Sequence, residues 1–278
     1  MNLPAAGLHS PAHAVPGIDW RAPWWDGLRE NGQRVMQAWQ GAPQGVPLHE
    51  ALNGVLDAAC TAQPVPQIRF VPQSALPEGC AYEAHLWQQR ECPTRENLHD
   101  FLNGLMWLRW PQAKRRINEL QAAEIARHGI GPVRGAVRDA LTLLDENGVL
   151  LQAPEAVRAE LLQALRARQW QRLFVDLRPL WQQARLWIVG HALLEKLVQP
   201  RKDITAHLWW DVACDATADD AAGALDAALA HSLTPQRLAR KPFLPLPVLG
   251  VPQWWAANAE PGFYDDAAVF RPARAAPA

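Results

Sequence analysis

The 278-residue sequence lacks several features that define broad classes of protein. It has no uninterrupted apolar run of about 18 residues, which excludes a membrane-spanning helix. Its start, MNLPAAGLHSPAHAVPG, has neither a basic region nor an apolar core, so we expect no secretory signal and a cytoplasmic protein. The formal net charge is only −1, so no overall field attracts nucleic acid or anionic lipid.

Cysteine is scarce, and motifs for common catalytic chemistry are missing. The four cysteines form no Cys-x-x-Cys pair and no zinc-finger spacing, so we expect reduced thiols. The phosphate-binding patterns GxGxxG and GxxxxGK[ST] are absent. GxSxG is absent as well, which argues against an ordinary α/β-hydrolase.

The composition of the sequence is typical of a globular protein. Apolar residues make up 49% of the sequence and charged residues 20%, which is enough apolar surface for a sizeable core. Tryptophan is frequent, with 14 residues, and it dominates cores and binding surfaces alike. Lysine is rare beside arginine, which fits a general bias of the genome towards arginine and alanine; the alternative is that each lysine marks a place where a compact ammonium suits better than a planar guanidinium. The lysines are Lys114, Lys196, Lys202 and Lys241.

Proline-rich ends flank a helix-rich centre. Residues 1–25 and 241–278 are predicted to be extended arms, and residues 26–240 are predicted to form the core of one domain. Residues 67–71 are expected to form a short strand, and residues 204–214 a strand or a helix. Helices are predicted at about 26–40, 47–61, 95–109, 111–128, 154–168, 170–184, 186–198 and 217–232.

The segment DALTLLDENGVLLQA (139–153) allows two interpretations. Its apolar runs on both sides of ENG favour a β-hairpin, and a helix over 136–146 is the alternative. With the hairpin, the fold class is α+β: a helix-dominated single domain with a short β-hairpin and proline-rich extended arms at both ends.

Polar side chains gather on the helix predicted at 95–109. His99 and Asn103 are four residues apart and share one face, and Asp100 borders the same patch. A cluster of these residue types suits acid–base chemistry or metal binding. The alternative is that they only form hydrogen bonds to neighbouring backbone.

The next helix places Lys114 and Asn118 on one face. If the two helices form a hairpin around Trp110 and Pro111, their polar faces converge. An ordinary solvated helix face is the alternative.

Two further groups complete the candidate set. Arg138 and Asp139 open the predicted hairpin, where Asp139 would be held at the start of a strand, whereas Asp145 and Glu146 are typical of its turn. His191 and Glu195 lie one helical turn apart in GHALLEKL, a spacing that can bind one metal ion. That helix is otherwise apolar, so a purely structural His–Glu pair remains the alternative.

Four stretches of the chain are similar to one known family. They are PTRENLHDFLNGLMWLRWPQAK (93–114), RGAVRDALTLLDENG (134–148), GHALLEKLVQP (190–200), and PLPVLGVPQWW with FYDDAAVFRP (245–272). In these stretches the chain resembles an uncharacterised bacterial family that is catalogued as a domain of unknown function. The resemblance extends over roughly residues 18–274 and implies one intact family domain, but no activity. Apart from Asn118, the polar candidates above lie within these stretches.

Our first functional hypothesis is a metal-dependent hydrolase that acts on a small anionic substrate such as a phosphoester. A divalent metal would be its cofactor and would activate water, with Lys114 and Arg138 holding the substrate. The predicted metal ligands are His99, Asp139, His191 and Glu195, and the predicted catalytic residues are His99, Asp100, Asn103, Lys114 and Arg138.

The alternative hypothesis is a non-catalytic module that binds a ligand or a protein. Exposed tryptophans such as Trp209–Trp210 and Trp254–Trp255 would line its groove. A nucleic-acid partner is a lesser variant, because RWPQAKRR (109–116) is basic but the chain as a whole is neutral.

Overall fold

The computed structural model describes residues 17–41, 45–59, 68–129, 135–210, 212 and 221–273. Helices predominate in this part of the chain, and the strands form two small sheets, so the predicted helix-dominated α+β class is confirmed. Within the same ranges, no helix combines the length and the hydrophobicity that crossing a bilayer requires.

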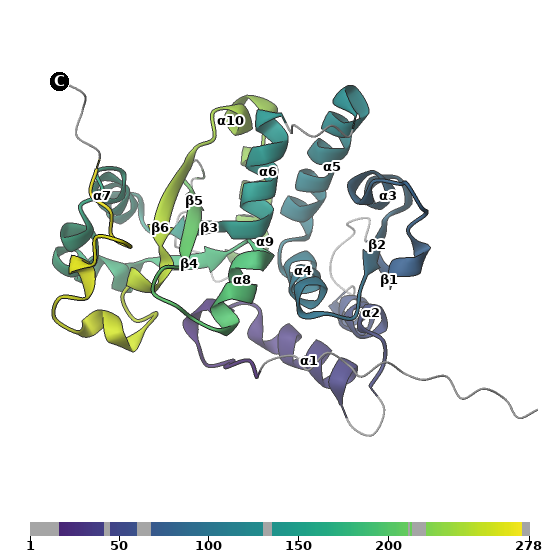
Figure 1. Cartoon of the computed structure of the whole chain (residues 1–278), viewed down its shortest axis with the longest axis horizontal. Helices are drawn as coiled ribbons and strands as arrows, with labels where there is room; N and C mark the ends of the chain where they lie inside the picture. The colour runs from purple at the N-terminus through teal and green to yellow at the C-terminus, as the bar shows by residue number, and fades with distance from the viewer. Residues whose placement is uncertain are drawn as a thin grey trace, which may run out of the picture.

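Four helices form the centre of the molecule (Figure 1). They are α4 (Leu98–Arg109), α5 (Pro111–His128), α6 (Ala136–Asn147) and α8 (His191–Val198). The side chain of Asn97 caps α4 by accepting a hydrogen bond from the backbone N–H of Asp100. Proline starts α5, and Gly129, with a φ of 70°, follows its last residue. The helices predicted at 95–109 and 111–128 are therefore present, packed against each other.

A four-stranded sheet packs beside these helices in the order β4–β3–β5–β6. The central pair, β3 and β5, is parallel, and both outer pairs are antiparallel. A separate two-stranded parallel sheet joins β1 to β2 and confirms the strand predicted at 67–71. The strands are β1 (Arg69–Pro72), β2 (Glu91–Thr94), β3 (Gly148–Gln152), β4 (Arg185–Ile188), β5 (Thr205–Trp209) and β6 (Phe243–Pro247).

The β-hairpin predicted at 139–153 is wrong, and the helical alternative is confirmed. Residues 136–147 form α6, which buries Ala140, Leu141 and Leu144 on one face, and β3 begins only at Gly148. Tertiary packing of this face outweighs the turn signal in ENG, because a helix buries three apolar side chains together. Asp139 therefore lies in the first turn of a helix rather than at the start of a strand.

The prediction of a single buried helix at 186–198 is also wrong for the residues before His191. Strand β4 occupies Arg185–Ile188, and α8 begins only at His191. Gly190 separates the two elements, and a Cβ atom at this position would lie 2.4 Å from the carbonyl carbon and oxygen of Glu146. This close approach of two backbones places the start of α8 directly against the end of α6.

The helix predicted at 170–184 is replaced by a π-helical turn at Arg172–Asp176 and a 3-10 turn at Arg178–Gln183. The remaining helices surround the centre. They are α1 (Arg29–Gln40), α2 (Leu48–Ala59), α3 (Tyr82–Gln89), α7 (Glu155–Arg166), α9 (Ala221–Ser232) and α10 (Pro235–Ala239).

The two predicted arms are described to different extents by the structure. The C-terminal arm contributes β6 to the sheet and then runs through 3-10 turns, with Leu249, Tyr264 and Phe270 buried. The described end of the N-terminal arm buries Trp24 and Trp25, while residues 1–16 lie outside the described residues. Both arms are thus packed on the core where the structure describes them.

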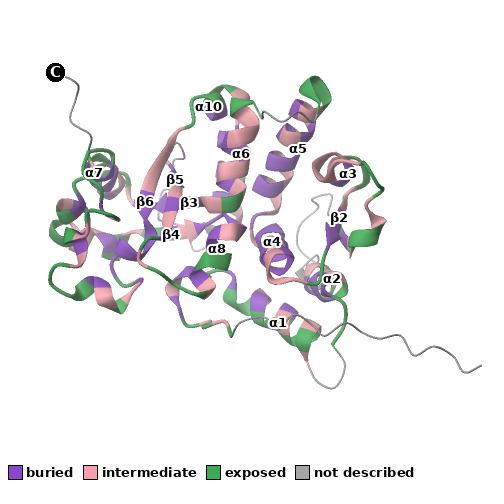
Figure 2. Ribbon diagram, in the orientation of Figure 1, coloured by how far each residue is buried: buried purple, intermediate pink, exposed green. Residues whose placement is uncertain are grey.

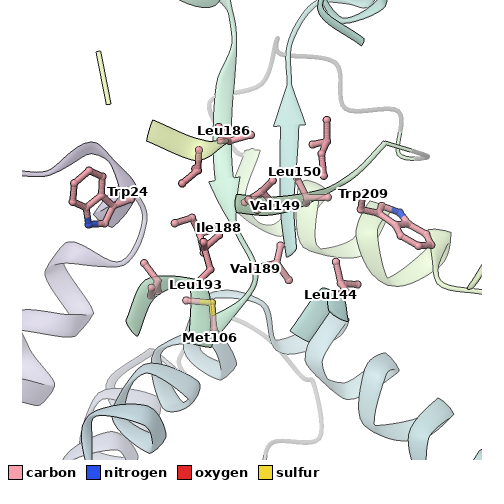
Figure 3. Close-up of a cluster of buried hydrophobic side chains, with 14 of the residues drawn as sticks. Trp24, Met106, Leu144, Val149, Leu150, Leu186, Ile188, Val189, Leu193 and Trp209 are labelled. Atoms are coloured by element: carbon pink, nitrogen blue, oxygen red, sulfur yellow. The ribbon is translucent and has the colours of Figure 1, made fainter. Parts of the chain in front are cut away.

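The sheet and the central helices share one hydrophobic core. Figure 2 shows buried residues on the four-stranded sheet and in α4. In Figure 3, Val149 and Ile188 of the sheet face Met106 of α4, Leu144 of α6 and Leu193 of α8, all of them at most 5% exposed. Burying each such side chain stabilises the fold by about 1.5–3 kcal/mol. This core holds α4, α6 and α8 in fixed relative positions.

We predict that Gly190→Ala destabilises the protein by about 1–3 kcal/mol, because its methyl group has no room against the backbone of Glu146. The matched control is Gly54→Ala in α2, where an added Cβ meets nothing within 4 Å. That change should be stabilising by about 0.5–1 kcal/mol through helix propensity. Urea unfolding measures both, and an equal effect of the two substitutions would show that the close approach at Gly190 is not real.

Candidate functional site

A cavity of about 380 Å³ opens between α3, α4, α5, α6 and α8. Its wall is predominantly polar, which distinguishes it from the apolar core on the other side of the same helices. Side chains from α4, α5, α6 and α8 form most of this polar wall: His99, Asp100, Asn103, Lys114, Asn118, Asp145, Glu146 and His191. The convergence of the polar faces of the first two of these helices is what the sequence led us to expect.

A chain of three ionisable side chains lies at one side of the cavity. Glu195 Oε2 is 2.8 Å from Nδ1 of His99, and Nε2 of His99 is 3.0 Å from Nε2 of His191. The two rings are nearly perpendicular, at 82°. His99 and Glu195 are each about 40% exposed at the side chain, whereas His191 is buried. The chain therefore runs from solvent into the interior.

The hydrogen bonds fix the tautomers of the neutral pair. A carboxylate only accepts, so His99 carries its hydrogen on Nδ1 and donates it to Glu195. Nε2 of His99 is then an acceptor, and His191 must donate to it from Nε2. The lone pair of His191 is consequently on Nδ1. This nitrogen is buried, has no hydrogen-bond partner among the described residues, and lies 3.9 Å from Oδ2 of Asp145.

Burial governs the charge of His191. Desolvation lowers the pKa of its imidazole to about 4, and the nearby Asp145 carboxylate offsets only part of this effect. At neutral pH the ring of His191 is therefore uncharged.

A buried ion pair lies beside the histidines. Nζ of Lys114 bonds to Oδ1 of Asp145 and donates to Oδ1 of Asn103 at 2.9 Å, and it sits 5.5 Å from the centroid of the Trp107 ring. The Lys114 side chain is only 4% exposed. Burial is the largest single influence on the pKa of Asp145 and raises it, but the charge of Lys114, the hydrogen bond from Lys114 and the two nearby histidines together lower the pKa overall. Asp145 is thus a carboxylate at neutral pH, and Lys114 is its partner.

Asp145 was assigned to turn chemistry in the sequence, and the structure places it in the site instead. The missed signal was Lys114, because a lysine on the polar face of a packed helix needs a carboxylate partner. In the helical alternative for 136–146, Asp145 and Glu146 both lie near the C-terminal end of α6, and both line the cavity.

Asp100 lines the cavity, but its carboxylate is already hydrogen-bonded to a neighbouring residue of the chain, Arg95. Its carboxylate accepts hydrogen bonds from the backbone and the guanidinium of Arg95, at 2.7–3.1 Å. These bonds hold the connection between β2 and α4. We therefore assign Asp100 a positioning role rather than the catalytic role expected from the sequence.

The structure does not bring Arg138 and Asp139 into the cavity. Asp139 lies on the first turn of α6 and pairs with Lys241 at 3.3 Å, and neither residue lines the cavity. The cause is that 136–147 form a helix rather than a hairpin, and a helix puts these residues more than two turns away from its C-terminal end. Across the described ranges, no group of three or more His, Cys, Asp or Glu side chains is arranged to hold a metal ion. The predicted metal set of His99, Asp139, His191 and Glu195 is therefore not assembled.

The sequence reasoning also missed Tyr82, on α3. Its hydroxyl is 3.1 Å from Sγ of Cys92 and 3.5 Å from Nδ2 of Asn103. Burial raises the pKa of Cys92 to about 11 and the pKa of Tyr82 well above its usual value. Cys92 is thus a neutral thiol at neutral pH, within hydrogen-bond distance of the Tyr82 hydroxyl.

The groove expected from paired tryptophans is not exposed. Trp209 and Trp254 are buried, and Trp210 and Trp255 are partly buried against the core. A second cavity, of about 240 Å³, does have Trp181, Trp187 and Trp254 in its wall, but it lacks a comparable cluster of ionisable groups.

Comparison with known proteins identifies a family but no activity. The model of a family described as "Protein of unknown function (DUF3025)" matches residues 68–274. No curated protein and no solved structure matches the chain. The resemblance to a domain of unknown function is therefore confirmed, and the matched residues include the entire polar wall of the cavity.

We predict strong coupling between Lys114 and Asp145. Asp145→Leu leaves a buried ammonium without its carboxylate and should cost about 3–5 kcal/mol, whereas Lys114→Met with Asp145→Leu should cost less than Asp145→Leu alone. A double-mutant cycle of urea unfolding measures the coupling. Additive effects would mean that the two side chains do not form a buried pair.

We also predict an acid-sensitive stability that depends on His191. Between pH 6.5 and about 4 the folded protein binds fewer protons at this ring than the unfolded chain, so the free energy of unfolding falls as the pH is lowered through this range. The loss should approach about 3 kcal/mol. Urea unfolding at several pH values should show a shallower pH dependence in His191→Gln. An unchanged slope would show that the ring is not buried in its neutral form.

Proposed function

The chain belongs to the DUF3025 family of proteins of unknown function, and we propose that it is a hydrolase that works by side-chain acid–base catalysis. The observation that carries the proposal is the hydrogen-bonded chain Glu195–His99–His191 at the edge of the polar cavity. A histidine oriented by a carboxylate beside a cavity is the arrangement that general bases require.

The pair of histidines is suited to accept one proton. When a proton arrives, Nδ1–H of His99 still donates to Glu195 and the second hydrogen lies between the two Nε2 atoms. His191 can then carry its own hydrogen on Nδ1, facing the Asp145 carboxylate. Each end of the protonated pair thus faces a carboxylate, which stabilises the added charge.

Hydrolysis follows from this proton uptake. A water molecule in the cavity attacks the scissile carbon or phosphorus atom while Nδ1 of His191, the free lone pair of the neutral pair, takes its proton and the hydrogen on Nε2 of His191 passes to His99. The pair then returns this proton to the leaving group, so the enzyme ends in its starting state. Glu195 keeps His99 in the reactive tautomer and stabilises the imidazolium, as the carboxylate does in hydrolytic triads.

The donor set favours side-chain catalysis over a metal-activated water. The two Nε2 atoms of His99 and His191 face each other. Neither nearby carboxylate is available as a further ligand, because Glu195 accepts a hydrogen bond from Nδ1 of His99 and Asp145 is paired with Lys114. Two imidazole nitrogens fall short of the three protein ligands that catalytic zinc sites use. The phosphoester part of our first hypothesis has less support for a similar reason, since the carboxylate partner of Lys114 offsets its charge.

We predict that His99→Gln lowers kcat/KM by about 10²–10⁴-fold, because it removes the base. The assay is a panel of chromogenic carboxylic esters, amides, glycosides and phosphoesters, tested with and without a chelator. The matched control is His231→Gln, which changes an exposed histidine at the end of α9 and should retain full activity.

Three results would reject the proposal: no hydrolysis of any compound in the panel, equal activity in His99→Gln and wild type, or activity that the chelator abolishes. The last of these would support the metal-dependent mechanism instead. Glu195→Gln should show a smaller loss than His99→Gln, because the base itself remains.

A further inference from the structure

We infer that the cavity binds a small organic cation, such as a protonated amine or a guanidinium group. The inference rests on the proposed function only in taking this cavity as the substrate site. It is carried by the ionisable groups of the wall, by their existing partners, and by a buried acceptor that lacks a donor.

Both permanent cations of the wall already have carboxylate partners. Lys114 is bonded to Asp145, and the guanidinium of Arg95 donates to both oxygens of Asp100. An anionic ligand would have to compete with these carboxylates, one of which belongs to a pair that is largely withdrawn from water. The wall therefore offers no uncommitted positive charge to a phosphate or a carboxylate.

Two carboxylates of the same wall have no partner. Glu83 on α3 and Glu146 on α6 line the cavity, and neither side chain forms an ion pair or a hydrogen bond within the described residues. Four carboxylates and two permanent cations line the cavity, so with neutral histidines its formal charge is −2. A concave site of one sign concentrates ligands of the opposite charge.

The uncharged groups of the wall include acceptors that a cation can use. Asn118 donates one Nδ2 hydrogen to the backbone carbonyl of Glu83, and its Oδ1 is uncommitted among the described residues. Nδ1 of His191 is an acceptor in the neutral site and has no donor among the described residues, although its side chain is 92% buried. An unsatisfied buried acceptor is costly, and a ligand or water with N–H or O–H groups next to it would remove that cost.

The positions of the free carboxylates favour an organic cation over a metal ion. Glu83 and Glu146 project from different helices, and no three acidic or histidine side chains of the described chain converge on one point. A volume of about 380 Å³ lies in the range of small-molecule pockets. The ring of Trp107, which also lines the cavity, adds a π face that attracts organic cations.

Calorimetric titration of the full chain with 1,4-diaminobutane tests the inference. The uncharged probe 1,4-butanediol and the anionic probe succinate have similar length, and MgCl₂ tests a simple metal ion, all at the same ionic strength. We expect the diamine to bind, and Glu146→Gln and Glu83→Gln each to weaken its binding at least tenfold. Glu260→Gln, an exposed glutamate outside the cavity, should bind the diamine like the wild type.

Several outcomes would overturn the inference: tighter binding of the diol or succinate than of the diamine, tighter binding of Mg²⁺, no binding of the diamine, or equal diamine affinity in Glu146→Gln and Glu260→Gln. Diamine binding by His99→Gln separates this inference from the proposed hydrolase activity. Binding without hydrolysis of any compound would reject the activity and keep the cation site, whereas hydrolysis without diamine binding would reject only the cation site.

Discussion

The buried ion pair of Lys114 and Asp145 is the interaction on which the site depends. It joins α5 to α6 at the edge of the core, and it places one carboxylate oxygen 3.9 Å from Nδ1 of His191. Two charges withdrawn from water are costly, and their attraction repays this cost only in a good geometry with further hydrogen bonds. Asn103 supplies one such bond from α4, so three helices meet at a single ammonium group. The scarcity of lysine in the sequence fits this role, because a compact cation can be enclosed on all sides.

Local patterns in the sequence predicted part of the site. The spacing of His99, Asn103 and Lys114 on two consecutive helices was enough to expect their convergence, since a short connection forces neighbouring helices to pack. The contact between His99 and His191 joins residues 92 positions apart, and no periodicity encodes such a pairing. It depends on the path of the chain through the sheet, which the sequence does not reveal.

The errors have one physical origin, which is the competition between local signals and burial. ENG is a strong turn signal, yet α6 includes Glu146 and Asn147 and ends only at the glycine, because Leu144 and its neighbours complete an apolar face. The apolar run at 186–198 contains no polar residue before His191, so its periodicity could not show where the strand ends. Gly190 was the available clue, because only glycine lets the backbone approach Glu146 so closely.

The burial of His191 makes the two histidines unequal as sites for a proton. Two equally solvated rings would share a proton evenly, but desolvation disfavours the charged form of the inner ring. His191 therefore stays the neutral member of the pair, and when the pair gains a proton its Nε2 accepts from Nε2 of His99 while its own hydrogen lies on Nδ1, toward Asp145. If Asp145 lost its lysine, its full negative charge would act on His191 and would draw the proton inward. The ion pair thus sets which of the two histidines is the base, and structural stability and proposed catalysis depend on the same contact.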